Sequence, residues 1–464
     1  MAGMAGVLSR EPVVAAFIVS RRRATCYPAP RTMPDRRCHP PGALWLVVVP
    51  AWTRTHTLMR CRQHHERTDL MSNNHARPLV NPLPEQRVAR VRAKMEQQGW
   101  DALVLTYGSH FQYVTGLETP IMYDNERCVG DHITALVLPL TGDPVFIVRP
   151  GWLRDHVEGM PFEVRAWDAG RDGGDHQAFL AQQVATLGLD GKRIAVPKTT
   201  WAQTLLAYQQ ALPNATFAAV TDTLIDEVRS IKDADELEIM QEASAITDRA
   251  FSAVVAQMQI GMLDRDLTIE IDYQLKKAGG DASSFPPTVV LDGHGSRWAR
   301  NWTDRTAPQP ITAGMTVAFD FGVMYRGYAS DFGRSVFIGE ARDEPLRAWR
   351  SITNAIQVAM GAMGDGKISP LGVHDLVVET VGADGFRDQF SWWALGHSIG
   401  MDVHENPWML PAWTEPVKAG MCFALEPKIG RPGQFYVRCE DVCVVGADAA
   451  HSLTRSTYEP IIIG

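Results

Sequence analysis

The chain has 464 residues, of which 45% are hydrophobic, and its formal net charge at pH 7 is −8. This length exceeds that of one ordinary domain and predicts two domains with a sizeable core. The negative charge excludes a general nucleic-acid binder, which needs a basic face. The seven cysteines have no regular spacing, so we expect no disulfide framework and a cytoplasmic location.

The first 70 residues differ in composition from the rest of the chain. They contain eleven Arg, no Lys and four acidic residues, without helical or strand periodicity. Such a segment can be a transit peptide, but Met71 opens a more conventional N-terminus. We therefore expect residues 1–75 to be a disordered extension, or sequence upstream of the true start. The apolar runs Val13–Val19 and Ala43–Pro50 are far shorter than the ~20 residues of a membrane span, so no membrane partner is predicted.

Residues 80–225 predict an α/β domain. Glu85–Gln98 has its apolar residues on one face, which is typical of an amphipathic helix. The apolar runs Asp101–Tyr107 and Ile133–Leu140 predict buried strands, and a turn then leads to a third strand at Val145–Val148. The continuing alternation of strands and helices favours a mixed sheet.

Residues 226–464 predict an α+β domain. A charged segment without Gly or Pro predicts one long helix over Leu224–Phe251, and another helix is expected within Val254–Ala278. Further strands are expected at Thr288–Leu291, Thr316–Phe321, Tyr328–Ile338, Met421–Pro427 and Tyr436–Val445, and further helices at Glu344–Met363 and Val373–Val381.

Two acids lie in apolar strand runs on either side of a turn-like centre, Val323–Arg326, which ends in Gly327. If these strands pair about that centre, Asp320 and Asp331 are opposed or nearly so and project to the same face. Two close carboxylates in an apolar setting are costly unless a cation lies between them, and a hard divalent cation meets that need. The alternative is that the acids reach solvent or pair with Arg326 and Arg334.

Two more acids lie in the last strand runs. Side-chain alternation places Glu426 on one face of its strand, and places Glu440 on the same face as Arg438 in the next strand. If the two runs form a hairpin, a second pair of carboxylates joins the first. The alternative for Arg438 and Glu440 is a simple ion pair on one face.

Two histidines, His397 and His404, lie in a stretch rich in small residues and turn signals. A single His there is more often a core residue than a ligand, but two beside four strand-borne acids favour a metal site. Carboxylates with one imidazole predict a centre for two divalent cations. No Cys is placed as a ligand, which disfavours a structural zinc site.

In this order, these residues resemble the pita-bread metallopeptidase family, in its branch of Xaa-Pro aminopeptidases and Xaa-Pro dipeptidases (prolidases). The matching pattern consists of Asp320, Asp331, the run GHSIGMDVHE from Gly396 to Glu405, Glu426-Pro427, and Arg438 to Asp441. This branch adds a creatinase-like N-terminal domain, which Arg87–Gly116 resembles. Val228–Ala245 is similar to the family's linker helix, with Arg229, Lys232 and Glu236.

The resemblance implies a hydrolase that cleaves Xaa-Pro peptides with a hydroxide bridging two metal ions. Asp320 would bind one ion, His397 and Glu426 the other, and Asp331 and Glu440 both. Glu426 would also shuttle the proton, His404 would bind the scissile carbonyl or the tetrahedral intermediate, and Arg438 would orient a bridging carboxylate. The ions would be Mn, Co, Zn or Fe.

The chain departs from the family at three places. The loop at Trp302–Asp304 lacks the usual His, Gly333 stands where Thr is usual, and Trp392-Trp393 stands where many relatives have His-Gly-x-Gly. These changes alter the surroundings of the substrate. They leave open a metal-dependent non-peptidase of the same fold, similar to ectoine hydrolase, creatinase or dimethylsulfoniopropionate lyase, that acts on a small metabolite.

The resemblance also implies a homodimer. In this family the N-terminal domain often contributes to the neighbour's active site. His110 and Tyr113 are candidates for that contribution, or are structural residues instead.

Overall fold

The computed structural model describes residues 85–117, 131–149, 162–168, 172, 174–220, 223–294, 296, 308–391 and 395–464. The expected extension at 1–75, the loop at Trp302–Asp304 and Trp392-Trp393 lie outside them. Among the described helices, none combines the length and the apolar character needed to cross a membrane.

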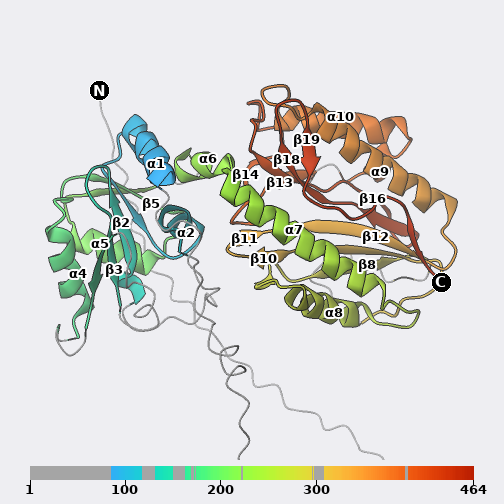
Figure 1. Ribbon diagram of the computed structural model, residues 1–464, viewed down its shortest axis with the longest axis horizontal. Coiled ribbons are helices and arrows are strands. Elements are labelled where there is room, and N and C mark those ends of the chain that lie inside the picture. The colour runs from blue at the N-terminus through green and yellow to red at the C-terminus, as the bar shows by residue number, and fades with distance from the viewer. Residues whose placement is uncertain are drawn as a thin grey trace, which may run out of the picture. The chain divides into compact units, whose positions relative to one another are not determined.

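The N-terminal part is built on a six-stranded mixed sheet (Figure 1). Its order is β4-β3-β2-β1-β5-β6, in which β1 runs antiparallel to β2 and parallel to β5. The strands are β1 (Ala102–Leu105), β2 (Ala135–Pro139), β3 (Val145–Val148), β4 (Glu163–Ala166), β5 (Arg193–Val196) and β6 (Thr216–Ala219). The helices are α1 (Glu85–Gln98), α2 (Ser109–Thr115), η1 (Asp131–Ile133), α4 (His176–Ala185) and α5 (Ala202–Ala211).

Helix α1 has the predicted bounds. Its buried apolar face is Val88, Val91 and Met95, at the spacing of one helical face. Strand β1 is buried along its length and β2 is buried except at Pro139, as their unbroken apolar runs predict. A mixed α/β sheet is therefore confirmed for this part of the chain.

The C-terminal part combines small sheets with four long helices. The helices are α6 (Ile225–Ser230), α7 (Ala234–Val255), α8 (Asp264–Lys277), α9 (Asp343–Ala362), α10 (Pro370–Ala383) and η3 (Arg387–Gln389). The first strands are β7 (Ala282–Ser283), β8 (Thr288–Asp292), β9 (Thr316–Phe321), β10 (Val323–Tyr325), β11 (Tyr328–Ala329) and β12 (Phe332–Ile338). The later ones are β13 (Gly396–Ser398), β14 (Glu405–Trp408), β15 (Cys422–Leu425), β16 (Lys428–Arg431), β17 (Phe435–Arg438), β18 (Asp441–Val445), β19 (Ala450–Ser452) and β20 (Ile461–Ile463).

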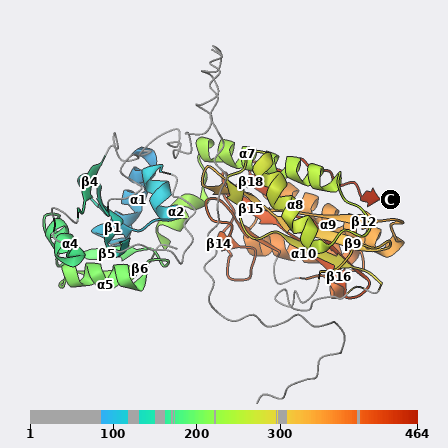
Figure 2. The same cartoon turned by 90° about the horizontal axis from the view of Figure 1, so that it is seen from below.

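The long helices form two pairs on the strands. Helix α7 packs on α8, which contacts β8, and α9 packs on α10 and contacts β17 (Figures 1 and 2). The sheets are ordered β20-β12-β9-β8, β14-β13-β15-β18-β19 and β11-β10-β7, with the hairpin β16-β17. A bridge between Gly333 and Glu440 connects the first two of these sheets.

The single helix expected over Leu224–Phe251 is wrong, because the chain forms α6 and α7 with a break between them. Asp233 caps α7: its carboxylate accepts from the backbone N–H of Glu236, and Glu236 accepts from the N–H of Asp233. The N–H of Lys232, inside the break, donates to the carbonyl of Gly420. Long-range pairing and a capping box thus override the local helical pattern.

Two further strand expectations need correction. Tyr328–Ile338 is split into β11 and β12, and Tyr436–Val445 is split into β17 and β18. The turn expected over Val323–Arg326 and ending in Gly327 is confined to Arg326-Gly327, both with positive φ, which suits a two-residue hairpin loop, while Val323–Tyr325 forms strand β10.

The last two strand runs pair as one antiparallel hairpin, in a single register that is interrupted at Glu426-Pro427 and Cys439-Glu440. Strand β15 pairs with β18, while β16 pairs with β17. The breaks fall beside Asp331 and Glu440, so both carboxylates leave the regular ladders and lie where the sheets meet.

Candidate metal centre

Asp320 and Asp331 lie on adjoining segments of β9 and β12 but are not directly opposed. The register pairs Asp320 with Gly333, and Asp331 comes just before β12, two residues from that position. Because side chains alternate with a period of two, both carboxylates still belong to the same face. The predicted proximity holds, with a register shifted by two residues.

His397 lies on β13, which pairs with β14 on one side and β15 on the other, and its ring is buried. Its Nδ1 lies 3.1 Å from the carbonyl oxygen of Ser398. A carbonyl can only accept, so Nδ1 carries the proton and Nε2 presents a lone pair. Burial lowers the pKa of His397 to about 4 and keeps the ring neutral.

The lone pair of His397 faces a carboxylate, since Nε2 lies 3.6 Å from Oδ2 of Asp331. Glu440 completes the group: one ligand atom from each of these three buried residues lies within 4.8 Å of the others. Glu440 Oε1 is buried and has no hydrogen-bond partner among the described residues. Three ligand atoms this close together, with one carboxylate oxygen left unpartnered, fit a divalent cation.

Electrostatics agree with this interpretation. Burial raises the pKa of Asp331 far above its usual range, and the neighbouring Glu440 raises it further. Burial likewise raises the pKa of Glu440. Carboxylates that are costly to ionise next to one another are typical of sites that bind a cation or share a proton.

Asp320 and Glu426 are brought to the same place through Arg438. Its guanidinium donates to Glu426 Oε2 at 2.9 Å and to Glu440 Oε2 at 3.1 Å, and it also pairs with Asp320. The alternative of an Arg438–Glu440 ion pair on one face is thus confirmed, and it coexists with the carboxylate cluster. Arg334 pairs instead with Asp441, at 2.7 Å.

Two neighbouring residues were not expected from the sequence. Lys428 Nζ lies 2.6 Å from Glu426 Oε2, and its side chain is nearly buried. Trp408 stacks on the ring of His404, with centroids 5.2 Å apart and planes at 23°. Lys428 could have been singled out from the sequence, because it stands two residues after Glu426. No pattern marked Trp408.

His404 is exposed, but its ring lies at the edge of the cluster. The centroids of His404 and His397 are 4.3 Å apart in a T-shaped arrangement. His404 therefore lies next to the cluster, but it is not one of the three mutually close ligands, Asp331, His397 and Glu440. The geometry suits a residue that contacts a substrate rather than one that only packs.

His110 and Tyr113 are both buried within the chain. His110 Nε2 lies 2.7 Å from Oδ1 of Asp226, and the hydroxyl of Tyr113 accepts from Arg90 at 3.0 Å. These contacts support a structural role for the two residues.

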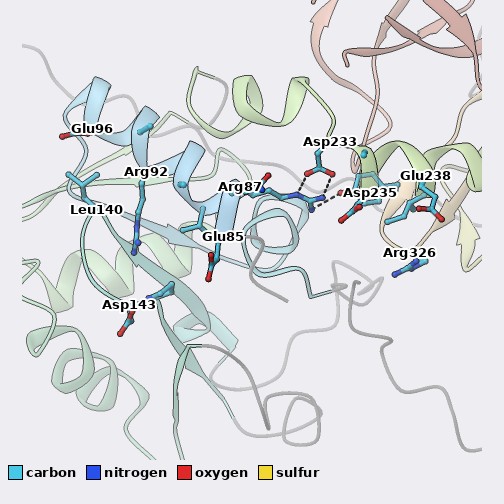
Figure 3. Close-up of a pocket in the computed structure, with 18 of the residues that line it drawn as sticks. Glu85, Arg87, Arg92, Glu96, Leu140, Asp143, Asp233, Asp235, Glu238 and Arg326 are labelled. Atoms are coloured by element: carbon cyan, nitrogen blue, oxygen red, sulfur yellow. Dashed lines mark hydrogen bonds and ion pairs between the residues drawn. The ribbon is translucent and has the colours of Figure 1, made fainter. Parts of the chain in front are cut away.

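A separate cavity of about 1660 Å³ lies between α1 and α7 (Figure 3). Arg87 and Asp233 face each other in it through hydrogen bonds of 2.8 and 2.9 Å, and Arg326 lines it from the β10–β11 turn. Neither Asp331 nor Glu440 lines this cavity, so size alone does not identify the chemically distinctive site.

Known proteins match both parts of the chain. Residues 238–447 match the model of metallopeptidase family M24, and residues 87–231 match that of the creatinase/prolidase N-terminal domain. The Xaa-Pro dipeptidase of Lactobacillus helveticus is 31% identical over 251 residues, which are 54% of this chain and 67% of that protein.

The chain belongs to metallopeptidase family M24.

Solved structures agree with this membership. A dipeptidase from Pyrococcus horikoshii OT3 has a TM-score of 0.72 and 28% identity, covering 81% of this M24 chain and 100% of its own. A prolidase from Thermococcus sibiricus has a TM-score of 0.71 and 26% identity, covering 82% and 99%. The predicted fold class, a creatinase-like α/β domain followed by an α+β pita-bread domain, is confirmed. As an M24 metallopeptidase, the protein is a hydrolase whose family depends on divalent metal.

Proposed function

We propose that this M24 member uses two divalent cations to cleave Xaa-Pro peptides, as a dipeptidase or an aminopeptidase. The observation that carries the proposal is the buried group of Asp331, His397 and Glu440, whose ligand atoms lie within 4.8 Å of one another and in which Glu440 Oε1 has no hydrogen-bond partner among the described residues. The relatives named as Xaa-Pro dipeptidase support the substrate class.

The resemblance to the family supplies the proposed division of the ligands between the two ions, and the clustering of the side chains supports it. Asp331 and Glu440, two of the three mutually close buried ligands, would bind both ions. His397, through its Nε2 lone pair, and Glu426 would complete one ion, while Asp320 would complete the other. Mn, Co, Zn and Fe are all compatible with a set of carboxylates and one imidazole.

The chemistry is shared between the cations and the side chains around them. Divalent cations bound here would acidify a water molecule and polarise the substrate carbonyl. Glu426, which Lys428 and Arg438 hold at Oε2, would accept the proton of the attacking water and pass it to the leaving amine. His404, exposed beside the cluster, would donate to the carbonyl oxygen as negative charge develops on it.

The test is a substrate panel with the purified full chain, loaded separately with Mn²⁺, Co²⁺, Zn²⁺ or Fe²⁺. It compares an Xaa-Pro dipeptide and a tripeptide with Pro second against the same peptides with Ala in place of Pro. Small zwitterionic amides and sulfonium compounds complete the panel. We expect cleavage of the Pro-containing peptides with at least one metal. Turnover of only the small metabolites would overturn the assignment in favour of a non-peptidase.

A further inference from the structure

A buried ion cluster lies directly next to His404 in the chain. The carboxylate of Glu405 accepts from Arg229 at 2.5 Å on Oε1 and from Lys232 at 3.1 Å on Oε2. All three side chains are at most 7% exposed, so water screens these contacts weakly. Burial alone would raise the pKa of Glu405, but Lys232 and Arg229 outweigh it and lower the pKa to about 2.

The loop that carries His404 is held at further points. Arg229 also donates to Oδ2 of Asp402 at 2.9 Å, so one guanidinium binds two acids of this loop. The N–H of Ala329 on β11, just before the Ser330-Asp331 break, donates to the carbonyl of Gly400 at 2.8 Å. A Cβ at Gly400 would come within 2.7 Å of the Glu405 carboxylate, so the backbone there closes tightly on the cluster.

His404 is exposed, whereas the next residue, Glu405, is buried. The ring of His404 stacks on Trp408 and makes an edge contact with His397. Contacts of this kind fix a ring only weakly. The direction in which His404 projects therefore depends on the backbone, which Glu405 and Asp402 hold in place.

We propose that Arg229 is a positioning residue: by binding Glu405 and Asp402 it holds His404 beside the candidate metal centre. Helix α6, which supplies Arg229, lies against β14, which begins at Glu405. Within the described part of the chain, Arg229 pairs with Asp226, Asp402, Glu405 and Ser109 and with no residue of the carboxylate cluster, so its effect is indirect. The inference rests on the proposed role of His404.

The kinetic test is a double-mutant cycle between Arg229 and His404, using the full chain loaded with the metal that gives the highest activity. Arg229→Met is expected to lower kcat at least about tenfold with KM nearly unchanged, because the lost contact acts in the transition state. Arg229→Met combined with His404→Ala should be no slower than His404→Ala alone. Losses that multiply would overturn the proposal. Arg249→Met, an exposed arginine on α7 paired with Glu242, is the matched control and should leave kcat unchanged.

A second readout is independent of turnover. In protein labelled with ¹³C at histidine, the ring resonance of His404 is identified by its loss in His404→Ala. It should shift or broaden in Arg229→Met and stay in place in Arg249→Met. An unchanged His404 resonance would overturn the inference even if the enzyme cleaves no Xaa-Pro peptide, whereas a substrate panel without cleavage bears on the proposed function alone.

Removing one buried charge can prevent folding. Arg229→Met, Lys232→Met and Glu405→Gln together remove all three buried charges, so no member of the cluster is left unpaired, and this triple change serves as the second variant. It should fold and still show the displaced His404 resonance and the low kcat. A triple variant that folds with wild-type kcat would refute the positioning role.

Discussion

Lys428 and Arg438 lie directly opposite each other on the β16–β17 hairpin, and both donate to the same atom, Oε2 of Glu426. Like charges in directly opposed positions normally destabilise a hairpin. Here the carboxylates of the candidate metal centre offset that repulsion. Glu426 is therefore shared between two fixed cations and any metal ion that it would bind.

This competition predicts that Lys428→Met tightens metal binding. Removal of a unit charge within a few Å of the ligands should raise the affinity of the weaker cation site by about tenfold or more. Calorimetric titration of the metal-free protein with Mn²⁺ measures this change. Arg431→Met is the control, because Arg431 on the same strand pairs with Glu344, outside the cluster. Unchanged or weaker binding in Lys428→Met would show that Lys428 supports the centre rather than competing in it.

Asp331→Ala should abolish metal-dependent activity. Loss of a partner outside the ligand shell already costs 10–100-fold in metal affinity or activity, so loss of a bridging ligand should cost more than about 100-fold. Metal content by mass spectrometry and kcat/KM on the best substrate measure the effect. Asp343→Ala, at an acid whose side chain is 90% exposed, is the control. Full metal content together with surviving activity would contradict a centre built on Asp331.

Metal affinity should increase with pH. Burial raises the pKa of Glu440 from 4.5 to about 8 in the metal-free protein, and the pKa of Asp331 is raised as well. A raised folded-state pKa stabilises the metal-free fold fully below pH 4.5, and that contribution is lost as pH rises toward about 8. A cation must displace these protons, so its affinity should rise over the same interval.

Calorimetry in buffers of different ionisation enthalpy counts the protons released at each pH. Glu440→Gln should release fewer protons and show a flatter dependence of affinity on pH. Proton release that is the same in the variant would assign the effect to other groups.

Gly333 is expected to tolerate no side chain. A Cβ there would lie 2.9 Å from Cβ of Glu440 and 3.0 Å from Nε of Arg438. Gly333→Ala should therefore lower the free energy of unfolding by about 1–3 kcal/mol, because the metal-site strands must move apart. The contrasting change is Gly361→Ala in α9, where a Cβ meets nothing within 4 Å, and which should stabilise the protein by about 0.5–1 kcal/mol. Urea unfolding of the metal-free proteins measures both, and equal stabilities for the two variants would contradict the packing described at Gly333.

The sequence by itself determined the elements with strong local signals. The bounds of α1 and β9 follow from apolar periodicity, which needs no partner to be visible. The identity of the cluster was also readable, because charged residues inside apolar strands are costly and must be compensated. Asp320, Asp331, Glu426 and Glu440 stand out for that reason alone.

Only the tertiary structure decided how these residues meet. The strand breaks beside Asp331 and Glu440, and the bridge from Glu440 to Gly333, depend on pairing between segments about 100 residues apart. Local periodicity carries no information about such pairing.

The partners of Lys428 and Arg229 could not be predicted from local sequence either. That Lys428 reaches Glu426, and that Arg229 binds Glu405 across 176 positions, follows from where the chain folds back. A charge acts through distance in space, and its neighbours in sequence do not fix that distance. The sequence determined which groups must be compensated, and the fold determined which partners compensate them.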